Sequence, residues 1–106
     1  MIHDEWKVVY LEQAEKDLHS IHYYIAKDLL SPENADGQVR RIRDAVSKLD
    51  HMPYRFHLFQ REPWKSRGMR MMPVDRYVVF YMPIEDKGIV AIFRILYGGM
   101  DAARHL

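Results

Sequence analysis

The sequence predicts a two-layer α+β fold with the element order β-α-α-β-β-β, in which a helical hairpin packs on one face of a curved, mainly antiparallel sheet. Two consecutive stretches repeat apolar residues every three or four positions, as amphipathic helices do. One short run of β-branched and aromatic residues precedes these stretches, and three such runs follow them. Helices and strands that are segregated along the chain favour an α+β architecture.

The first strand is predicted over residues 6–11, which are rich in aromatic and β-branched side chains. From Glu12 onward, apolar residues recur every three or four positions. The residues in that register are Ala14, Leu18, Ile21, Ile25 and Leu29. The remaining positions, Lys16 and Asp17 among them, are polar and are expected on the solvent face. This pattern predicts a first helix from Glu12 to about Leu29.

The second helix is predicted from Ser31 to about Asp50. Ser31 is a suitable N-cap, Pro32 suits the first helical position, and Glu33 favours the positive end of the helix dipole. The apolar positions of this stretch are Ala35, Val39, Ile42, Val46 and Leu49. Because the connection to the first helix is short, the two helices are expected to lie antiparallel.

Three strands are predicted in the second half of the chain, over residues 68–74, 77–82 and 89–97. Pro53 ends the helical pattern, and residues 51–66 look irregular. Pro73 confines its strand to a sheet edge or a bulge, because proline cannot donate to a ladder. The chain is expected to form one domain, residues 1–106.

Composition points to a cytoplasmic protein. The chain has no cysteine, which excludes disulfides and thiolate metal sites and fits a reducing compartment. Its apolar runs are too short to cross a membrane, and the acidic N-terminus lacks the apolar core of a signal peptide. His19 and His22 have a spacing that can share a metal ion, but no third ligand is evident. We therefore expect neither a metal nor a cofactor.

Charge is distributed unevenly along the chain. Residues 1–53 carry 7 Lys or Arg and 10 Asp or Glu, a net charge of −3, whereas residues 54–106 carry 9 and 5, a net of +4. The positive excess is concentrated in Arg55, Arg61, Lys65, Arg67, Arg70 and Arg76. Such a stretch attracts phosphate backbones or acidic protein segments. It is equally consistent with a solvated loop that happens to be basic. The aromatic residues interleaved with these cations are typical of a surface that binds single-stranded nucleic acid, or they seal the loop onto the core; they are Tyr54, Phe56, Phe59 and Trp64.

Arg94 is the only charged residue in the last predicted strand, where alternation places it on the same face as Val90, Ile92 and Leu96. A buried guanidinium needs a partner. We expect an ion pair with Asp75 or Asp101 at the sheet rim. The alternative is that Arg94 is presented in a groove on the second sheet face, which the predicted architecture leaves uncovered.

Four stretches, in this order, resemble the RelE/ParE toxins of type II toxin–antitoxin systems. They are residues 14–26, residues 42–53, residues 67–81 around Arg67-Gly68-Met69-Arg70 and Tyr77-Val78-Val79-Phe80-Tyr81, and residues 94–101 with Arg94-Ile95-Leu96-Tyr97-Gly98-Gly99. The resemblance spans nearly the whole chain. It implies a growth-inhibiting toxin that is neutralised by a cognate acidic antitoxin, with no membrane partner.

The resemblance allows two activities. RelE-like toxins cleave mRNA on the ribosome without a metal, and ParE-like toxins inhibit DNA gyrase instead. Arg70 occupies the place of a RelE-like strand lysine, but Val78 stands where a strand arginine is expected after Tyr77. The ending of the fourth strand, and the Tyr-Ile-Ala run of the first helix, look more like the ParE side.

Gyrase is therefore the leading target, and a ribosome-dependent mRNA endoribonuclease is the alternative. A third class is a non-toxic relative that retains only antitoxin binding. If the chain is a nuclease, the candidate catalytic residues are Arg70, Arg76, Arg94, Tyr97 and His105.

Overall fold

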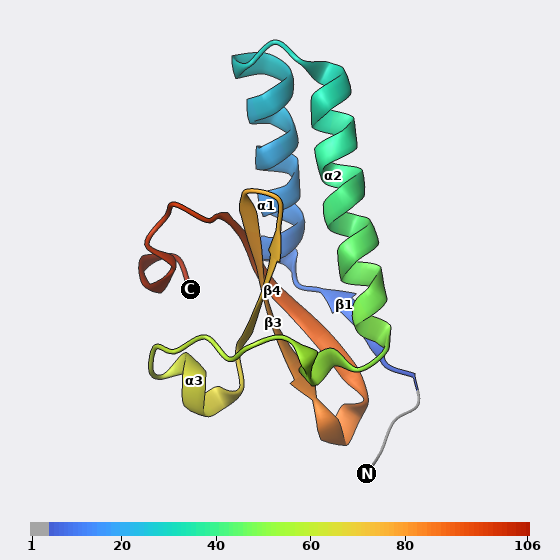
Figure 1. Ribbon diagram of the computed structural model, residues 1–106, viewed down its shortest axis with the longest axis vertical. Coiled ribbons are helices and arrows are strands. Elements are labelled where there is room, and N and C mark those ends of the chain that lie inside the picture. Colours follow the sequence, from blue (N-terminus) through green and yellow to red (C-terminus); the bar gives the residue numbers. More distant parts are fainter. Residues whose placement is uncertain (1–4) are drawn as a thin grey trace.

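A computed structural model, which describes residues 5–106, has the predicted α+β architecture (Figure 1). Its main elements are β1 (Lys7–Tyr10), α1 (Glu12–Tyr23), α2 (Pro32–Ser47), α3 (Trp64–Arg67), β2 (Arg70–Val74), β3 (Tyr77–Ile84) and β4 (Ile89–Tyr97). The four strands form one sheet in the order β1-β4-β3-β2. β1 runs parallel to β4, and the other two pairings are antiparallel. The predicted edge position of Pro73 is confirmed, because β2 is an outer strand.

The helical hairpin is an arm that projects beyond the sheet (Figure 1). A π-helical turn, Tyr24–Asp28, extends α1, and Leu30 then reverses the chain with a φ of 53°. α2 starts with Pro32 in its first turn, as expected, but the Ser31 side chain makes no capping hydrogen bond. The projection gives the molecule a longest dimension of 47 Å.

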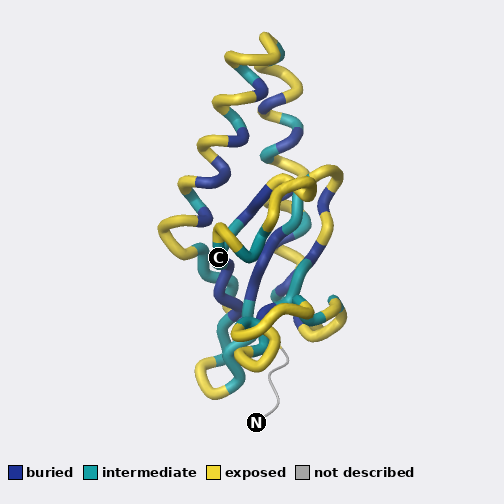
Figure 2. Tube along the Cα trace, turned by 90° about the vertical axis from the view of Figure 1, so that its left-hand side faces the viewer, coloured by how far each residue is buried: buried dark blue, intermediate teal, exposed yellow. Residues whose placement is uncertain are grey.

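The main core lies between the hairpin and one face of the sheet (Figure 2). The helices contribute the predicted apolar stripe, since Ala14, Leu18, Ile42 and Val46 are all buried. The sheet contributes the alternate residues of its strands, as period two requires. Its fully buried members include Val79, Tyr81, Val90, Ile92 and Ile95.

The prediction that the second sheet face is uncovered was wrong. Segment 59–69 and the C-terminal residues pack against it and form a second apolar cluster with Met69, Phe80 and Leu96 at its centre. Alternation explains this cover, because the side chains between the main-core positions of β3 and β4 are also apolar and would otherwise be exposed. The short helix α3 within this segment was not predicted; four residues are too few to show a period.

No helix among residues 5–106 has the length and apolarity needed to cross a membrane. In the same part of the chain, acidic residues and histidines form no group of three that could ligate a metal ion. His22, one of the two histidines considered above, is hydrogen-bonded to Asp36 at 2.7 Å.

Candidate functional site

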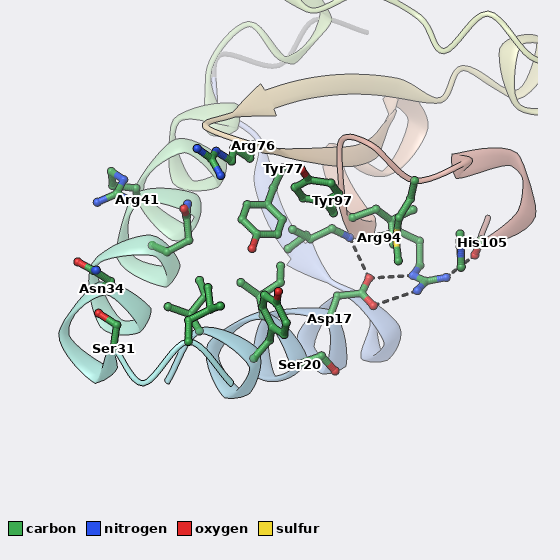
Figure 3. A pocket seen from close by; sticks show the side chains of 18 residues that line it. Asp17, Ser20, Ser31, Asn34, Arg41, Arg76, Tyr77, Arg94, Tyr97 and His105 are labelled. Atoms are coloured by element: carbon green, nitrogen blue, oxygen red, sulfur yellow. Dashed lines mark hydrogen bonds and ion pairs between the residues drawn. The ribbon is translucent and has the colours of Figure 1, made fainter. Parts of the chain in front are cut away.

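A groove of about 800 Å³ lies between the helical hairpin and the sheet (Figure 3). Its walls come from α1, α2, the turn between β2 and β3, and the end of β4. Its charged, aromatic and hydrogen-bonding lining residues include Asp17, Tyr24, Ser31, Asn34, Gln38, Arg41, Arg76, Tyr77, Arg94, Tyr97 and His105. Segments from both halves of the sequence therefore converge on one surface.

One end of the groove is closed by an ion pair between α1 and β4. Arg94 Nε donates to Asp17 Oδ2 at 2.8 Å, and Arg94 Nη2 donates to Asp17 Oδ1 at 3.0 Å (Figure 3). The backbone N–H of Ile95 also donates to Asp17, at 2.9 Å, and Gln13 donates to it at 3.3 Å. The hydrogen bond to Asp17 raises the pKa of Arg94. The remaining Arg94 nitrogen, Nη1, donates to the carbonyl of His105.

This pair corrects two expectations from the sequence. Arg94 is paired, as expected, but with Asp17 and not with Asp75 or Asp101. The ladder pairs Tyr81 with Ile92 and Phe80 with Arg94, so β4 contains one extra residue at this point. Such a bulge shifts the alternation.

The shifted alternation changes which face each β4 residue occupies. Ile92 and Ile95 face the helices, and Leu96 belongs to the cluster on the opposite face. Arg94 therefore does not share a face with all three residues named above. Asp17, expected on the solvent face of its helix, is buried.

The other end of the groove is fixed by a clamp on Asp75, in the turn between β2 and β3. Its Oδ2 accepts hydrogen bonds from Gln38 at 2.9 Å and from Arg41 at 2.8 Å, both on α2. Both hydrogen bonds lower the pKa of the Asp75 carboxyl, and the bond from Arg41 has the larger effect. Asp75 has a φ of 55°, a strained conformation that persists only where the surroundings hold it. The clamp fixes the turn against the helix.

Arg76, Tyr77 and Tyr97 lie between these two ends (Figure 3). The rings of Tyr77 and Tyr97 meet edge to face, with centroids 6.0 Å apart. Burial raises the pKa of Tyr77 above its ordinary value. Arg76 is exposed, and its guanidinium forms no hydrogen bond or ion pair within the described part of the chain.

The structure brings together four of the five residues named as nuclease candidates. Arg76, Arg94, Tyr97 and His105 all line the groove. Arg70 lies elsewhere: its Nη1 donates to the backbone carbonyls of Tyr54 and Phe56 at 3.1 and 2.6 Å. Its guanidinium also sits 5.1 Å from the centre of the Tyr54 ring.

The basic stretch is divided among three environments. Arg55 donates to the backbone carbonyls of Lys48, His51 and Met52, just after α2, while Arg70 holds the loop described above. Arg76 lies in the groove. The exposed members outside the groove are Arg61, Lys65 and Arg67, around α3, and their side chains form no hydrogen bond or ion pair among residues 5–106.

Sequence reasoning missed several groove residues. Asp17 had a usable signal, because it lies three residues after Ala14 and four before Ile21 and so falls within the apolar stripe. Gln38 and Arg41 carried no such signal. Their role depends on a turn 34 or more residues away in sequence.

The ion pair leaves the groove with side chains suited to binding. Arg94 is paired with Asp17, and each Asp17 oxygen accepts two hydrogen bonds. The other polar side chains that line the groove carry the Arg76 guanidinium, the His105 imidazole, tyrosine hydroxyls and neutral amide and hydroxyl groups. Such a set can attract an anion, stack on a ring and donate hydrogen bonds.

Comparisons with known proteins give one family. Residues 8–102 match the model of the family described as the ParE toxin of the type II toxin–antitoxin system parDE. No curated protein sequence matches the chain significantly.

Solved structures share the fold at low sequence identity. A chain of the chromosomal ParDE toxin–antitoxin system of P. aeruginosa is 19% identical, with a TM-score of 0.73, over 90% of this chain and 98% of that one. A mutant of the E. coli toxin RelE in the free state is 10% identical, with a TM-score of 0.66, over 95% and 92%. A chain of the RelBE2 complex of Mycobacterium tuberculosis is 19% identical, with a TM-score of 0.59, over 88% and 98%.

Proposed function

The chain belongs to the ParE toxin family of type II toxin–antitoxin systems, and we propose that it arrests growth by binding DNA gyrase and does not cleave mRNA. In this proposal the groove is the surface that contacts the target. Its free guanidinium and exposed rings supply binding energy without a covalent step.

The observation that carries the proposal is the pairing of Arg94 with Asp17. Cleavage of RNA needs a group that removes a proton and a cation that stabilises the developing negative charge. Arg94 lies on β4 and is one of the cations that line the groove. Its guanidinium already donates hydrogen bonds to Asp17 and to the His105 carbonyl. Arg70, the other strand cation considered for catalysis, holds loop carbonyls outside the groove.

A second function, ribosome-dependent mRNA cleavage, has one observation in its favour. Arg76, Tyr97 and His105 line the same groove. A free guanidinium, a phenol and an imidazole are chemically sufficient for acid–base cleavage if the substrate brings them into contact. The structure gives no hydrogen bond between any two of these three side chains.

The partner in the cell is proposed to be a cognate acidic antitoxin. The solved relatives include toxin–antitoxin complexes, namely RelBE2 of Mycobacterium tuberculosis and RelE–RelB of Pyrococcus horikoshii. The free Arg76 in the groove and the exposed cations around α3 form the positive surface that an acidic segment would meet.

Induced expression tests the proposal. Production without the antitoxin should stop growth, relax a supercoiled reporter plasmid and leave cellular mRNA uncut, and co-expression of the antitoxin should restore growth. Growth arrest with mRNA cut at codon-defined positions would instead support the nuclease. Normal growth at high expression would support a non-toxic antitoxin-binding relative.

A further inference from the structure

Tyr97 is held in place but remains half exposed. A Cβ on Gly99 would lie 2.7 Å from Cε2 of Tyr97, so the tyrosine ring lies directly against the glycine backbone. The edge-to-face contact with Tyr77 restrains the ring from another direction. Even so, 50% of Tyr97 is accessible. A large aromatic ring that is fixed and yet exposed is ready to stack on another ring.

Gly98 joins the chain segment that carries this ring to the backbone of Arg76. Its backbone N–H donates to the carbonyl of Arg76 at 2.8 Å, and a Cβ at this position would lie 3.2 Å from that oxygen. The close approach joins the end of β4 to the turn before β3. Arg76 and Tyr97 therefore both line the groove from its sheet side, with Tyr77 between them in Figure 3.

The side chains that line the groove include more cations than carboxylates. Among residues 5–106, Asp17 is the only carboxylate that lines it, and both Asp17 oxygens accept hydrogen bonds. The lining cations are Arg41, Arg76 and Arg94, of which the first and last are paired with aspartates. Ser31 and Asn34 add neutral hydrogen-bonding groups to the helical wall.

We propose that the groove binds a short segment of single-stranded nucleic acid, with a base stacked on Tyr97 and a phosphate on Arg76. Stacking rings and a cation beside them are the chemistry of sequence-tolerant single-strand binding. An acidic peptide would satisfy Arg76 but would leave unexplained why Tyr97 is held exposed by a glycine.

The inference deepens the proposed function, because gyrase acts on DNA and a strand in the groove would lie at the same surface as the target. It differs from the nuclease alternative because the bound strand is not cut. Gly99 is a positioning residue in this scheme: it sets the Tyr97 ring and does not contact the strand.

Binding of fluorescent single strands of about ten nucleotides tests the inference. Oligo-dT and oligo-U are the two probes, measured by fluorescence anisotropy with the full chain. We expect both to bind. Tyr97→Ala should weaken binding about tenfold, and Tyr97→Phe should retain it. Arg76→Ala should weaken binding and lower the slope of log affinity against log salt by about 1.

Gly99→Ala separates stacking from charge. The alanine methyl group would displace the Tyr97 ring while every charge stays in place. We expect weaker binding with an unchanged salt slope, and no further loss when Gly99→Ala is added to Tyr97→Ala. Arg40→Ala is the matched control, because Arg40 is exposed on α2 but does not line the groove.

Three results would overturn the inference. Wild-type affinity in the Tyr97→Ala and Arg76→Ala variants would overturn the inference, as would equal loss in Arg40→Ala. Poly-glutamate binding that falls as far in Tyr97→Ala as oligo-dT binding does would overturn it too, because the ring would then serve an acidic peptide. Because growth arrest and plasmid relaxation are measured independently of this binding, failure of the inference and failure of the proposed function are distinguishable.

Discussion

Asp17 on α1 and Arg94 on β4, 77 residues apart in sequence, form a two-bond ion pair that joins the helical hairpin to the sheet. Removal of the arginine would leave a carboxylate that is only 9% exposed without its cation. We expect Arg94→Ala to destabilise the fold by about 1–3 kcal/mol. Thermal unfolding should shift down by several degrees, measured by circular dichroism.

Arg104→Ala is the control for that variant, because Arg104 and its partner Asp101 are exposed and 3.7 Å apart. It should leave the melting temperature nearly unchanged. A soluble Arg94→Ala protein that melts normally but has lost toxicity would show that Arg94 contacts the target and that its pairing with Asp17 is secondary.

The clamp on Asp75 predicts a pH-dependent stability difference. Its hydrogen bonds hold the pKa of Asp75 below the ordinary 3.8, so their stabilisation is present above that value and is lost as the pH falls through the lowered pKa. Asp75→Asn removes the charge but tolerates the same left-handed backbone. We expect it to lower the urea midpoint near neutral pH, and the difference in midpoint between the two proteins to narrow as the pH falls below 3.8. A difference that is equally wide in acid would contradict the electrostatic origin of the clamp.

The antitoxin complex predicts different effects of charge reversal at different parts of the basic stretch. Arg76→Glu should weaken antitoxin binding and reduce its salt dependence, because repulsion replaces attraction at an exposed site. Arg70→Glu is a poor test, since it also removes the hydrogen bonds that hold the Tyr54 and Phe56 carbonyls. Arg67→Glu tests whether the cations around α3 also contribute to antitoxin binding.

Titration calorimetry with the antitoxin at two salt concentrations measures these effects. Arg40→Glu, which adds the same charge change on α2 outside the groove, is the control. Affinity that is unchanged by both Arg76→Glu and Arg67→Glu would place the antitoxin on another surface.

The apolar periodicity of the sequence was enough to predict the helices, the strands and their layering. It predicted the edge position of β2 from Pro73 and the antiparallel hairpin from the short connection. It did not predict the bulge in β4, because an extra residue leaves no mark in an almost continuous apolar run. That single residue was enough to misplace the side chain of Arg94.

The candidate site could be predicted only in part, for a similar reason. Arg76, Arg94, Tyr97 and His105 were named from the sequence, and they lie in one groove. Their pairings could not be named. The choice of Asp17 over Asp75 as the partner of Arg94 depends on where α1 crosses β4, a long-range contact that local spacing does not encode.

The central claim is that this ParE-family toxin inhibits gyrase and is not a nuclease. It is tested most directly by adding the purified protein to gyrase with relaxed plasmid, and in parallel to ribosomes programmed with a labelled mRNA. The account predicts loss of supercoiling with the mRNA intact, and a weaker effect for Arg76→Ala. Codon-positioned cleavage of the mRNA with supercoiling unaffected would contradict it.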